Sequence, residues 1–501
     1  MKRLAALLLS FLLLAGCGQQ AEVPQEHVHA DAEDNGVCDT CNASVIVPVD
    51  FYSINDLHGK LTDGEGQPGV EEMTTYLKSA WETHENMVLL SAGDMWQGSS
   101  ESNLTAGNLT TEWMNEIGFN AMALGNHEFD WGEEPVRNNS ELAQFPFLAI
   151  NIYNREKDTP VDYCQSSLLL DLGEVQIGII GAIGDCYSSI AAEQVEDIYF
   201  KTGDELTQLV MLESTLLREN GADYIVYMLH DGYEESESGS VKNTKSSSFA
   251  GYYDTALSDG YVDLVFEGHT HQRYILRDVH DVYHMQNKGE NKGISHVTVN
   301  INSVTGSSKI AVSNLITSGQ YATENKDPLI DELLDKYSEI IAPAYEVLGN
   351  TAKMRNSTEL RNLIAQLYYE KGVALWGDEY DIVLGGGFIS VRSPYDLPAG
   401  EVIYGQLQMI FPFDNHLVLC SIKGKDLQER FFEEHKNYYI SCGQYGQSVQ
   451  NNLDPNATYY VVVDSYSSVY GPNKLTEITR YEEDIFARDL LADYIRNGGF
   501  E

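Results

Sequence analysis

Five short segments of the sequence each join an apolar run to aspartate, asparagine or histidine at the end of that run. The segments are FYSINDLHG, LLSAGDMWQG, AMALGNHEFD, YIVYMLHDG and LVFEGHTH. Their polar ends supply Asp56, His58, Asp94, Asn126, His230, His269 and His271, and His127 follows Asn126 directly. Carboxylate oxygens and imidazole nitrogens bind Mn, Zn, Co or Fe better than Ca or Mg. These residue types therefore predict a centre for two divalent metal ions of unspecified identity.

The spacing within the motifs supports a shared centre. Asp56 and His58 are two residues apart, as are His269 and His271, so each pair projects to one side of an extended chain. Two ions about 3.5–4 Å apart need a common ligand, and a carboxylate such as Asp94 can bridge them. One such motif alone is more typical of a structural histidine or a turn. Together, however, the motifs hold five of the 13 histidines, which favours a functional site.

The elements that must position these side chains follow from the hydrophobic pattern. Short apolar runs with β-branched residues alternate with helical patterns such as VEEMTTYLKSAWETH and ELTQLVMLESTLLREN. This alternation predicts an α/β sheet domain over residues 45–315. Ligand sites in such sheets form beyond the carboxyl ends of the strands, so we expect the motifs to meet at one edge of one sheet.

A second domain is expected after this one. The stretch DPLIDELLDKYSEIIAPAYEVLG has apolar residues at helical spacing and predicts a connecting helix within residues 316–349. Residues 350–501 then mix a helical pattern, a Gly-rich turn (LGGGF) and strand patterns such as HLVLCSIKG and TYYVVVDSY. The pattern indicates a separate α/β domain.

The N-terminus carries an export signal. Lys2 and Arg3 precede the apolar run Leu4–Leu14, which is too short to span a bilayer. The following LAGC resembles a bacterial lipobox, which implies a signal peptide over residues 1–16 and lipid on Cys17; an ordinary signal peptide is the alternative. Residues 17–44 are polar and indicate a flexible spacer. We expect an exported protein that is lipid-anchored on the extracytoplasmic side of the membrane.

Composition limits the partners. The formal net charge of −45 disfavours nucleic-acid polymers and anionic lipid surfaces, because like charges repel. An anionic substrate therefore needs metal ions or a few arginines at its site. We expect a monomer.

The remaining cysteines allow several interpretations. His27, His29, Cys38 and Cys41 could supply four zinc ligands, but a single CxxC is a weak signal, and we prefer a small disulfide loop or an inert spacer. In an oxidising compartment, two local disulfides could form among the other four cysteines, which are Cys164, Cys186, Cys420 and Cys442.

In their order along the chain, DLHG, GD, GNHE, a strand-end histidine and GHTH resemble the motifs of the calcineurin-like metallophosphoesterases. The spacing is most similar to the branch of bacterial 5′-nucleotidases and 2′,3′-cyclic phosphodiesterases. That resemblance implies an N-terminal β-sandwich flanked by helices and a C-terminal α/β domain that binds the substrate. GGG, FPFDN and IKGKDLQERF in the second domain are similar to the C-terminal domain of that branch.

The same resemblance implies residue roles. One metal ion would be held by Asp56, His58, Asp94 and His271, and the other by Asp94, Asn126, His230 and His269. His127 would not be a ligand: it would pair with Asp130, contact the phosphate and assist the leaving group. The ions would lower the pKa of a bound water, and the resulting hydroxide would attack phosphorus without a covalent intermediate.

Substrate recognition is less well specified. Phe413 matches a position that stacks on the nucleobase, although a core aromatic is equally compatible with the residue alone; Tyr466 or Tyr470 could form the opposite face. Asn415 and Arg392 are further candidates, Arg392 for ribose or phosphate. The chain departs from the family at Leu384, at GGGFISVR and at SSVYGPN, where base and ribose would be recognised.

The leading hypothesis is thus a surface 5′-nucleotidase that converts nucleoside 5′-monophosphates to nucleoside and phosphate. A 2′,3′-cyclic-nucleotide phosphodiesterase or a UDP-sugar hydrolase is the alternative with the same chemistry. A non-catalytic nucleotide-binding lipoprotein is the alternative from another class, and the complete ligand set argues against it.

Overall fold

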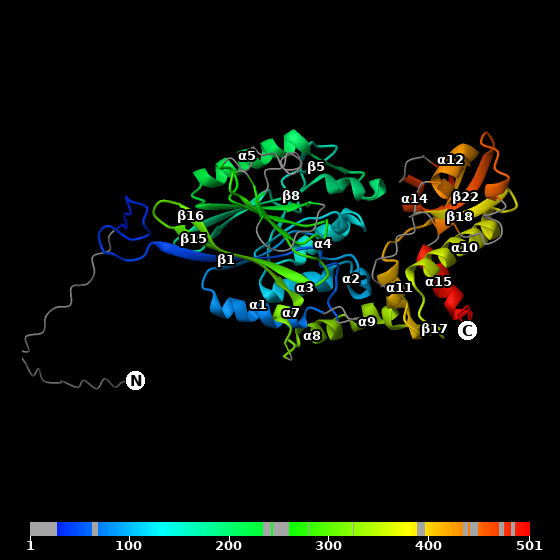
Figure 1. Cartoon of the computed structure of the whole chain (residues 1–501), viewed down its shortest axis with the longest axis horizontal. Helices are drawn as coiled ribbons and strands as arrows, with labels where there is room; N and C mark the ends of the chain where they lie inside the picture. The colour runs from blue at the N-terminus through cyan, green and yellow to red at the C-terminus, as the bar shows by residue number, and fades with distance from the viewer. Residues whose placement is uncertain are drawn as a thin grey trace, which may run out of the picture.

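The computed structural model describes most of the chain after residue 27. The described residues are 28–62, 69–233, 242–243, 260–278, 280–323, 325–387, 396–433, 439–440, 449–469, 475–481 and 486–500. The predicted signal peptide, Cys17, His27, Arg392 and Tyr470 lie outside them. Figure 1 shows two lobes, with the C-terminal residues forming the smaller one.

The N-terminal lobe is a sandwich of mixed sheets. One sheet has the order β16 (Ser308–Thr317), β15 (Gly293–Asn302), β1 (Ile46–Ile54), β2 (Met87–Ser91), β3 (Ala121–Ala123), β4 (Phe147–Leu148). The facing sheet has the order β11 (Lys242–Asn243), β13 (Tyr274–Arg277), β14 (Tyr283–Gln286), β12 (Leu264–Glu267), β10 (Tyr224–His230), β8 (Gln176–Ile183), β7 (Ser167–Asp171). A small sheet of β6 (Thr159–Pro160), β5 (Ile152–Asn154) and β9 (Ile198–Phe200) lies beside them. The neighbours β1, β2 and β3 run parallel, as do β8, β10 and β12.

Apolar side chains fill the space between the sheets and under the helices. Phe51 and Val88 of one sheet share a buried cluster with Ile179, Val226 and Phe266 of the other. The outer face of the first sheet packs on α1 (Glu71–Thr83), α3 (Asn108–Ile117) and α4 (Glu133–Leu142), and that of the second on α5 (Gly203–Glu219). Figure 1 shows α1 and α5 on opposite sides of the sandwich. The expected β-sandwich flanked by helices is confirmed.

The expectation that all the motifs meet at one edge of one sheet is wrong. Asp56, Asp94 and Asn126 follow β1, β2 and β3 of the first sheet, whereas His230 ends β10 and His269 follows β12 of the second. Parallel strands of both sheets end at the same side of the sandwich, so the motifs still converge. A hydrophobic pattern reveals that a strand is buried but not which layer it joins.

The connection between the lobes is a series of short helices where one helix was expected. It comprises α7 (Ser318–Tyr321), α8 (Leu329–Lys336), α9 (Ser338–Ile341) and a 3-10 turn at Ala342–Tyr345. Pro328 immediately precedes α8, and Pro343 lies in the first turn of the 3-10 segment. Proline lacks a backbone N–H and is tolerated at the start of a helix but not inside it, which explains why α8 begins after Pro328 and α9 ends before Pro343.

The C-terminal lobe is an α/β domain. Its main sheet has the order β21 (Tyr439–Ile440), β18 (Ile382–Gly387), β22 (Thr458–Asp464), β20 (Leu417–Lys423), β23 (Thr476–Arg480), and β17 (Val347–Thr351) pairs with β19 (Gly400–Ile403). Its helices are α10 (Ser357–Trp376), α11 (Tyr404–Ile410), α12 (Gly424–Gln428), α14 (Ser465–Val469) and α15 (Ala487–Arg496). α10, α11 and α15 pack on one buried cluster of the domain, and α12 packs on another.

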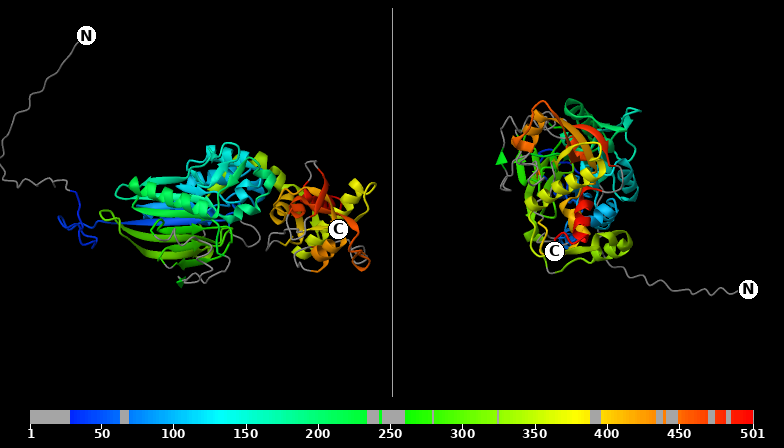
Figure 2. Two further views of the ribbon diagram at one scale, coloured as in Figure 1. Left: turned by 90° about the horizontal axis from the view of Figure 1, so that it is seen from above. Right: turned by 90° about the vertical axis from the view of Figure 1, so that its right-hand side faces the viewer.

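The segment of residues 28–44, which we call the N-terminal segment, is folded where a flexible spacer was expected. Val37 and Ser44 form an antiparallel bridge, and Asp31 is only 3% exposed. Figures 1 and 2 both place this segment at the end of the sandwich remote from the C-terminal lobe. Among the described residues, we find no helix with the length and apolar character that a membrane crossing requires.

The disulfides that the sequence allowed do not form among the described cysteines, and Cys38 and Cys41 do not form the small disulfide loop either. Cys164, Cys186 and Cys420 carry free thiols, and Cys442 lies outside the described residues. The thiol of Cys186 donates to the carbonyl oxygen of His230 at 2.9 Å, while that of Cys164 lies 3.7 Å from the oxygen of Ala149. Burial raises the pKa of the Cys186 thiol well above its ordinary value, which keeps it protonated.

Candidate metal centre and substrate pocket

The seven predicted ligands converge at the strand ends. Nε2 of His58 lies 3.1 Å from Nε2 of His271, which is 3.4 Å from Oδ1 of Asp56. Oδ2 of Asp94 lies 3.1 Å from Nε2 of His230. Asp56, His58 and His271 form one group with ligand atoms all within 4.8 Å, and Asp56, Asp94 and His230 form another. We call the seven residues the strand-end cluster.

Backbone conformation marks the strand-end cluster as a special site. Asp56, His58, Asp94, His269 and His271 all have positive φ, between 51° and 70°. Side chains with a Cβ rarely adopt this left-handed conformation, which costs about 1–3 kcal/mol per residue unless the surroundings impose it. Such a concentration of strained residues is typical of sites where function dictates the geometry.

Neighbouring carbonyl groups orient the imidazole rings. Nδ1 of His58 donates to the carbonyl oxygen of Gln97 at 2.8 Å, and Nδ1 of His230 donates to that of Ala92 at 2.6 Å. A proton on Nδ1 leaves the lone pair on Nε2, which faces the other members of the cluster. Hydrogen bonds of this kind fix the tautomer of metal-binding histidines.

The electrostatics of the cluster suit a cation. Burial alone would raise the pKa of the Asp94 carboxyl, but His230 and His127 beside it hold the pKa well below its usual range. Burial disfavours charge on His230 as well, yet Asp94 raises the pKa of His230 to about 10. Metal binding would displace the proton of His230, because an imidazole must be neutral to act as a ligand.

The residues present fit the divalent ions that the motifs predict. Oδ1 of Asn126 is buried and has no hydrogen-bond partner among the described residues. Leaving a buried polar atom unsatisfied costs about 1–3 kcal/mol, so the position of this oxygen calls for a ligand. Carboxylate, amide and imidazole donors are those of Mn, Zn, Co and Fe centres.

Glu128 has a structural role. It is fully buried, and its carboxylate accepts from the backbone N–H groups of Gly125 (2.7 Å), Asp94 (2.9 Å) and Met95 (2.8 Å). Burial, followed by repulsion from Asp94, raises the pKa of Glu128 to about 7. Glu128 thus ties the loops that carry Asp94 and Asn126 to each other.

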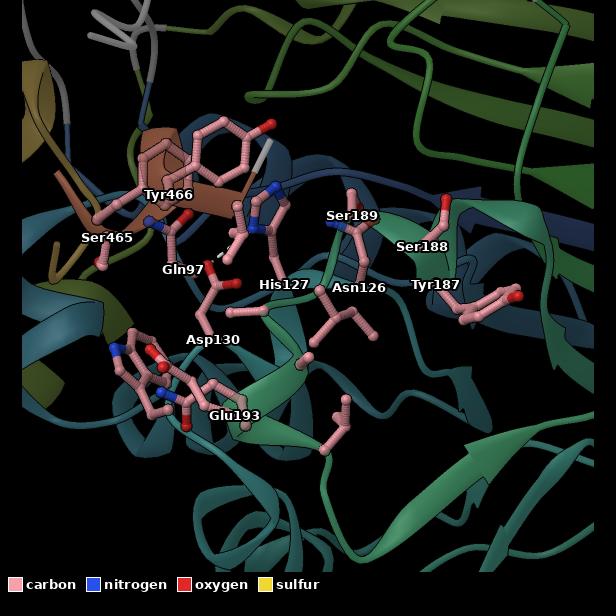
Figure 3. A pocket seen from close by; sticks show the side chains of 18 of the residues that line it. Gln97, Asn126, His127, Asp130, Tyr187, Ser188, Ser189, Glu193, Ser465 and Tyr466 are labelled. Carbon is pink, nitrogen blue, oxygen red and sulfur yellow. Dashed lines mark hydrogen bonds and ion pairs between the residues drawn. The ribbon is translucent and has the colours of Figure 1, made fainter. Parts of the chain in front are cut away.

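His127 lies at the edge of the cluster with Asp130 behind it. Nδ1 of His127 is 2.8 Å from Oδ2 of Asp130, and its backbone N–H donates to Oδ1 of Asp94 at 2.8 Å. The ring is partly exposed and faces the cavity shown in Figure 3.

A cavity of about 720 Å³ connects the strand-end cluster to the C-terminal lobe. Asn126, His127 and His269 line it from one side, and Phe413, Asn415 and Tyr466 line it from the other. The rings of His127 and Phe413 are stacked, with centroids 5.8 Å apart and an interplanar angle of 28°. Three of the predicted substrate-binding residues therefore meet the cluster in one cavity, while Arg392 and Tyr470 lie outside the described residues.

Arg488 holds the loop that carries Phe413. Its guanidinium is almost fully buried, donates to the carbonyl oxygen of Phe413 at 3.0 Å and also contacts the carboxylate of Asp414. Gln97 braces the same loop from the N-terminal lobe, since its Nε2 donates to the carbonyl oxygen of Pro412 at 3.1 Å. Phe413 is half-buried and lines the cavity, so it is not a simple core residue.

The sequence did not reveal the remaining wall of the cavity. Tyr187, Ser188, Glu193 and neighbouring residues of the β8–β9 connection line it together with Arg155 and Arg480. Arg480 spans the two lobes through an ion pair with Glu193 at 2.7 Å. Nothing in the pattern of this connection distinguishes it from an ordinary polar loop.

The buried carboxyl group of Asp464 makes the stability of the folded chain depend on pH. It is fully buried, accepts from the backbone N–H of Ser467 at 2.7 Å and thereby starts α14, which carries Tyr466. Burial raises the pKa of Asp464 from 3.8 to about 6, so the folded state binds more protons than the unfolded state between these values. Stability therefore falls as the pH rises from about 4 to 6, by up to about 3 kcal/mol from this group.

Asp464→Asn keeps the oxygen that accepts from Ser467 but removes the titration. We expect the melting temperature of this variant to fall less than that of the wild type between pH 4 and 6. Parallel curves for the two proteins would contradict the assignment.

The chain is similar in sequence to a known protein family and to several characterised proteins. Residues 50–273 match the family of calcineurin-like phosphoesterases. The Bacillus subtilis protein Endonuclease YhcR is 26% identical over 90% of this chain, which spans only 38% of the length of that relative. A 5′-nucleotidase of Diplobatis ommata is 25% identical over an alignment that covers 80% of this chain and 74% of that protein.

A solved structure shares the fold. The structure of the 5′-nucleotidase precursor of Thermus thermophilus superposes on this chain with a TM-score of 0.67 and 19% sequence identity. The superposition covers 90% of this chain and 96% of the Thermus chain. The similarity extends across both lobes, so the two-lobed architecture is shared as a whole.

Proposed function

We propose that this chain, whose residues 50–273 match the family of calcineurin-like phosphoesterases, is a metal-dependent phosphoester hydrolase that converts nucleoside 5′-monophosphates to nucleoside and phosphate. The observation that carries the proposal is the shared cavity of about 720 Å³, which Asn126 and His269 of the strand-end cluster line together with His127, Phe413 and Tyr466. Small-molecule sites typically measure about 300–1,000 Å³, so a mononucleotide fits.

Each part of the site has a proposed task. Residues 45–315 supply the chemistry, with Asp56, His58, Asp94 and His271 around one ion and Asp94, Asn126, His230 and His269 around the other. When bound, two divalent ions would activate water as the nucleophile and offset charge on the phosphoryl group. Residues 350–501 supply the contacts to the nucleoside, including Phe413, Asn415 and Tyr466.

His127 acts on the leaving group in this proposal. Asp130 holds the proton of Nδ1 through their 2.8 Å hydrogen bond, which keeps the ring in one tautomer and orientation. Nε2 can then stabilise the phosphoryl oxygens and hand a proton to the departing ribose oxygen.

Phe413→Ala tests the role of the C-terminal lobe. Stacking on a base contributes about 1–3 kcal/mol, so we expect kcat/KM for AMP to fall about 5- to 150-fold. Ribose 5-phosphate has no base, and its hydrolysis should be unaffected. Because Phe413 also stacks on His127, an equal loss with both compounds would instead assign Phe413 to the positioning of that ring and contradict base stacking.

The same chemistry could act on other phosphoester substrates. A 2′,3′-cyclic nucleotide or a UDP-sugar would use the same cluster, and the departures at Leu384 and in GGGFISVR and SSVYGPN bear on that choice. The name of the relative Endonuclease YhcR suggests a nucleic-acid polymer as another candidate substrate. The net charge of −45 disfavours binding of such a polyanion.

We also propose that the chain is exported and anchored through lipid on Cys17. The support is the leader sequence, with Lys2 and Arg3, the apolar run and LAGC. Cys17→Ala should move the chain from the membrane fraction to the soluble fraction without loss of specific activity. Retention of the variant in membranes would contradict lipid anchoring.

A further inference from the structure

Three side chains of the N-terminal segment gather at a place remote from the strand-end cluster. They are His29, Cys38 and Cys41, whose ligand atoms all lie within 4.8 Å of one another. Sγ of Cys41 lies 3.6 Å from Nδ1 of His29. Cys38 is buried, whereas His29 and Cys41 are exposed. One imidazole nitrogen and two sulfur atoms are thus brought together from sequence positions up to twelve residues apart.

A tight turn builds this arrangement. The backbone N–H of Cys38 donates to the carbonyl oxygen of Ala43 at 2.8 Å, and that of Asn42 donates to the carbonyl oxygen of Cys38 at 2.9 Å. Asn42 has φ 60°, the left-handed conformation that asparagine tolerates in turns. The backbone N–H of Ala43 points at Sγ of Cys41 at 3.5 Å.

The turn is fixed to the sandwich by polar contacts. Oδ2 of Asp31 accepts from the amide of Asn302 at 2.8 Å and from the backbone N–H of Gly36 at 2.7 Å. Oδ1 of Asp34 accepts from Asn302, Thr305 and Ser307. Cys38 is the buried apolar residue of this segment, so the segment has little hydrophobic core of its own. Segments of this kind are commonly held by a crosslink or a metal ion.

We propose that His29, Cys38 and Cys41 bind a structural zinc ion. Two thiolates and an imidazole suit Zn²⁺, which prefers sulfur and nitrogen donors in a tetrahedral site. The three side chains supply three of the four positions of such a site, and a further donor of the chain takes the fourth. The donor set differs from the strand-end cluster, whose members offer only oxygen and nitrogen.

The position indicates what the ion does. Segment residues 28–44 directly precede β1, whereas Asp56 follows the other end of that strand. Nine residues at about 3.3 Å each separate these ends by roughly 30 Å, so the ion takes no part in phosphoester hydrolysis. It would stiffen the segment through which the N-terminus joins the sandwich.

Zinc content and X-ray absorption of the full-length chain in detergent test the proposal. We expect Cys38→Ser/Cys41→Ser to contain one zinc equivalent less than the wild type, with phosphoester turnover unchanged. The zinc edge of the wild type should show sulfur neighbours at about 2.3 Å that the double variant lacks. With cobalt in place of zinc, the wild type should show a sulfur-to-cobalt charge-transfer band.

Cys186→Ser is the matched control. Cys186 lies with His230 and His269, so it is another described cysteine that could contribute sulfur to a metal ion. The proposal requires zinc content and sulfur neighbours to survive this change.

Absence of sulfur neighbours in the wild type, or a Cys38–Cys41 disulfide in the purified chain, would overturn the proposal. Both readouts use the wild type, so they decide the matter even if the double variant does not fold.

Discussion

Asp94→Asn will lower kcat at least about 10³-fold while the chain remains folded. Asp94 is 1% exposed and lies at the centre of the cluster: Oδ1 accepts from His127 N–H at 2.8 Å, and Oδ2 is 3.1 Å from Nε2 of His230. Asparagine removes the negative charge of the proposed bridging ligand. Metal ions held by the cluster would lower the activation barrier by several kcal/mol, and each 1.36 kcal/mol is a factor of about ten in rate. Steady-state kinetics with AMP and metal content per chain measure the effect.

Asp50→Asn is the matched control for this change. Asp50 is also a buried carboxylate next to histidines, with Nδ1 of His84 at 2.8 Å and Nε2 of His296 at 2.9 Å. It lies outside the cavity and the strand-end cluster. We expect Asp50→Asn to lower stability but to retain kcat and metal content. Comparable kcat losses in the two variants would contradict the role given to Asp94.

His127→Ala will lower kcat about 10²- to 10⁴-fold with little change in metal content. The range is that of a positioned acid or base in a transition state. The loss should depend on the leaving group: large for AMP, whose alkoxide leaves with difficulty, and small for an aryl phosphate with an acidic phenol. Rates for both substrates measure this difference.

Asp130 acts through His127 and is a positioning residue. We expect Asp130→Asn to cost less than His127→Ala, to shift the pH profile of kcat, and to add nothing in the double variant, because residues acting as a unit are not additive. His84→Ala is the control, since His84 forms an imidazole–carboxylate pair of the same 2.8 Å length with Asp50. Equal losses for both classes of leaving group would contradict the role of His127.

The sequence was sufficient to find the strand-end cluster because its members follow buried strands directly. Asp56, Asp94 and Asn126 come within three residues of the ends of β1, β2 and β3, and chain direction alone brings such ends together. Their assignment to one sheet failed because Phe51 and Val226 show the same buried pattern, although they face each other from different layers.

Other features depend on contacts that span long stretches of chain. Tyr187 and Glu193 reach the cavity only because the β8–β9 connection passes beside the C-terminal lobe. The N-terminal segment folds because the side-chain amide of Asn302, more than 250 residues away, donates to Asp31 and Asp34. Composition alone indicated a flexible spacer, because the polar residues of this segment are the ones that make those bonds.

Nucleoside 5′-monophosphates are the substrates that we propose for this chain. The direct measurement is kcat/KM of the metal-loaded full-length chain for AMP, UMP, 2′,3′-cyclic AMP, UDP-glucose, a single-stranded oligonucleotide and an aryl phosphate. We expect the highest kcat/KM for a nucleoside monophosphate, and we expect Asp94→Asn to lose this activity. A higher value for the cyclic nucleotide, the UDP-sugar or the oligonucleotide would contradict the proposal, as would an absence of turnover with metal bound.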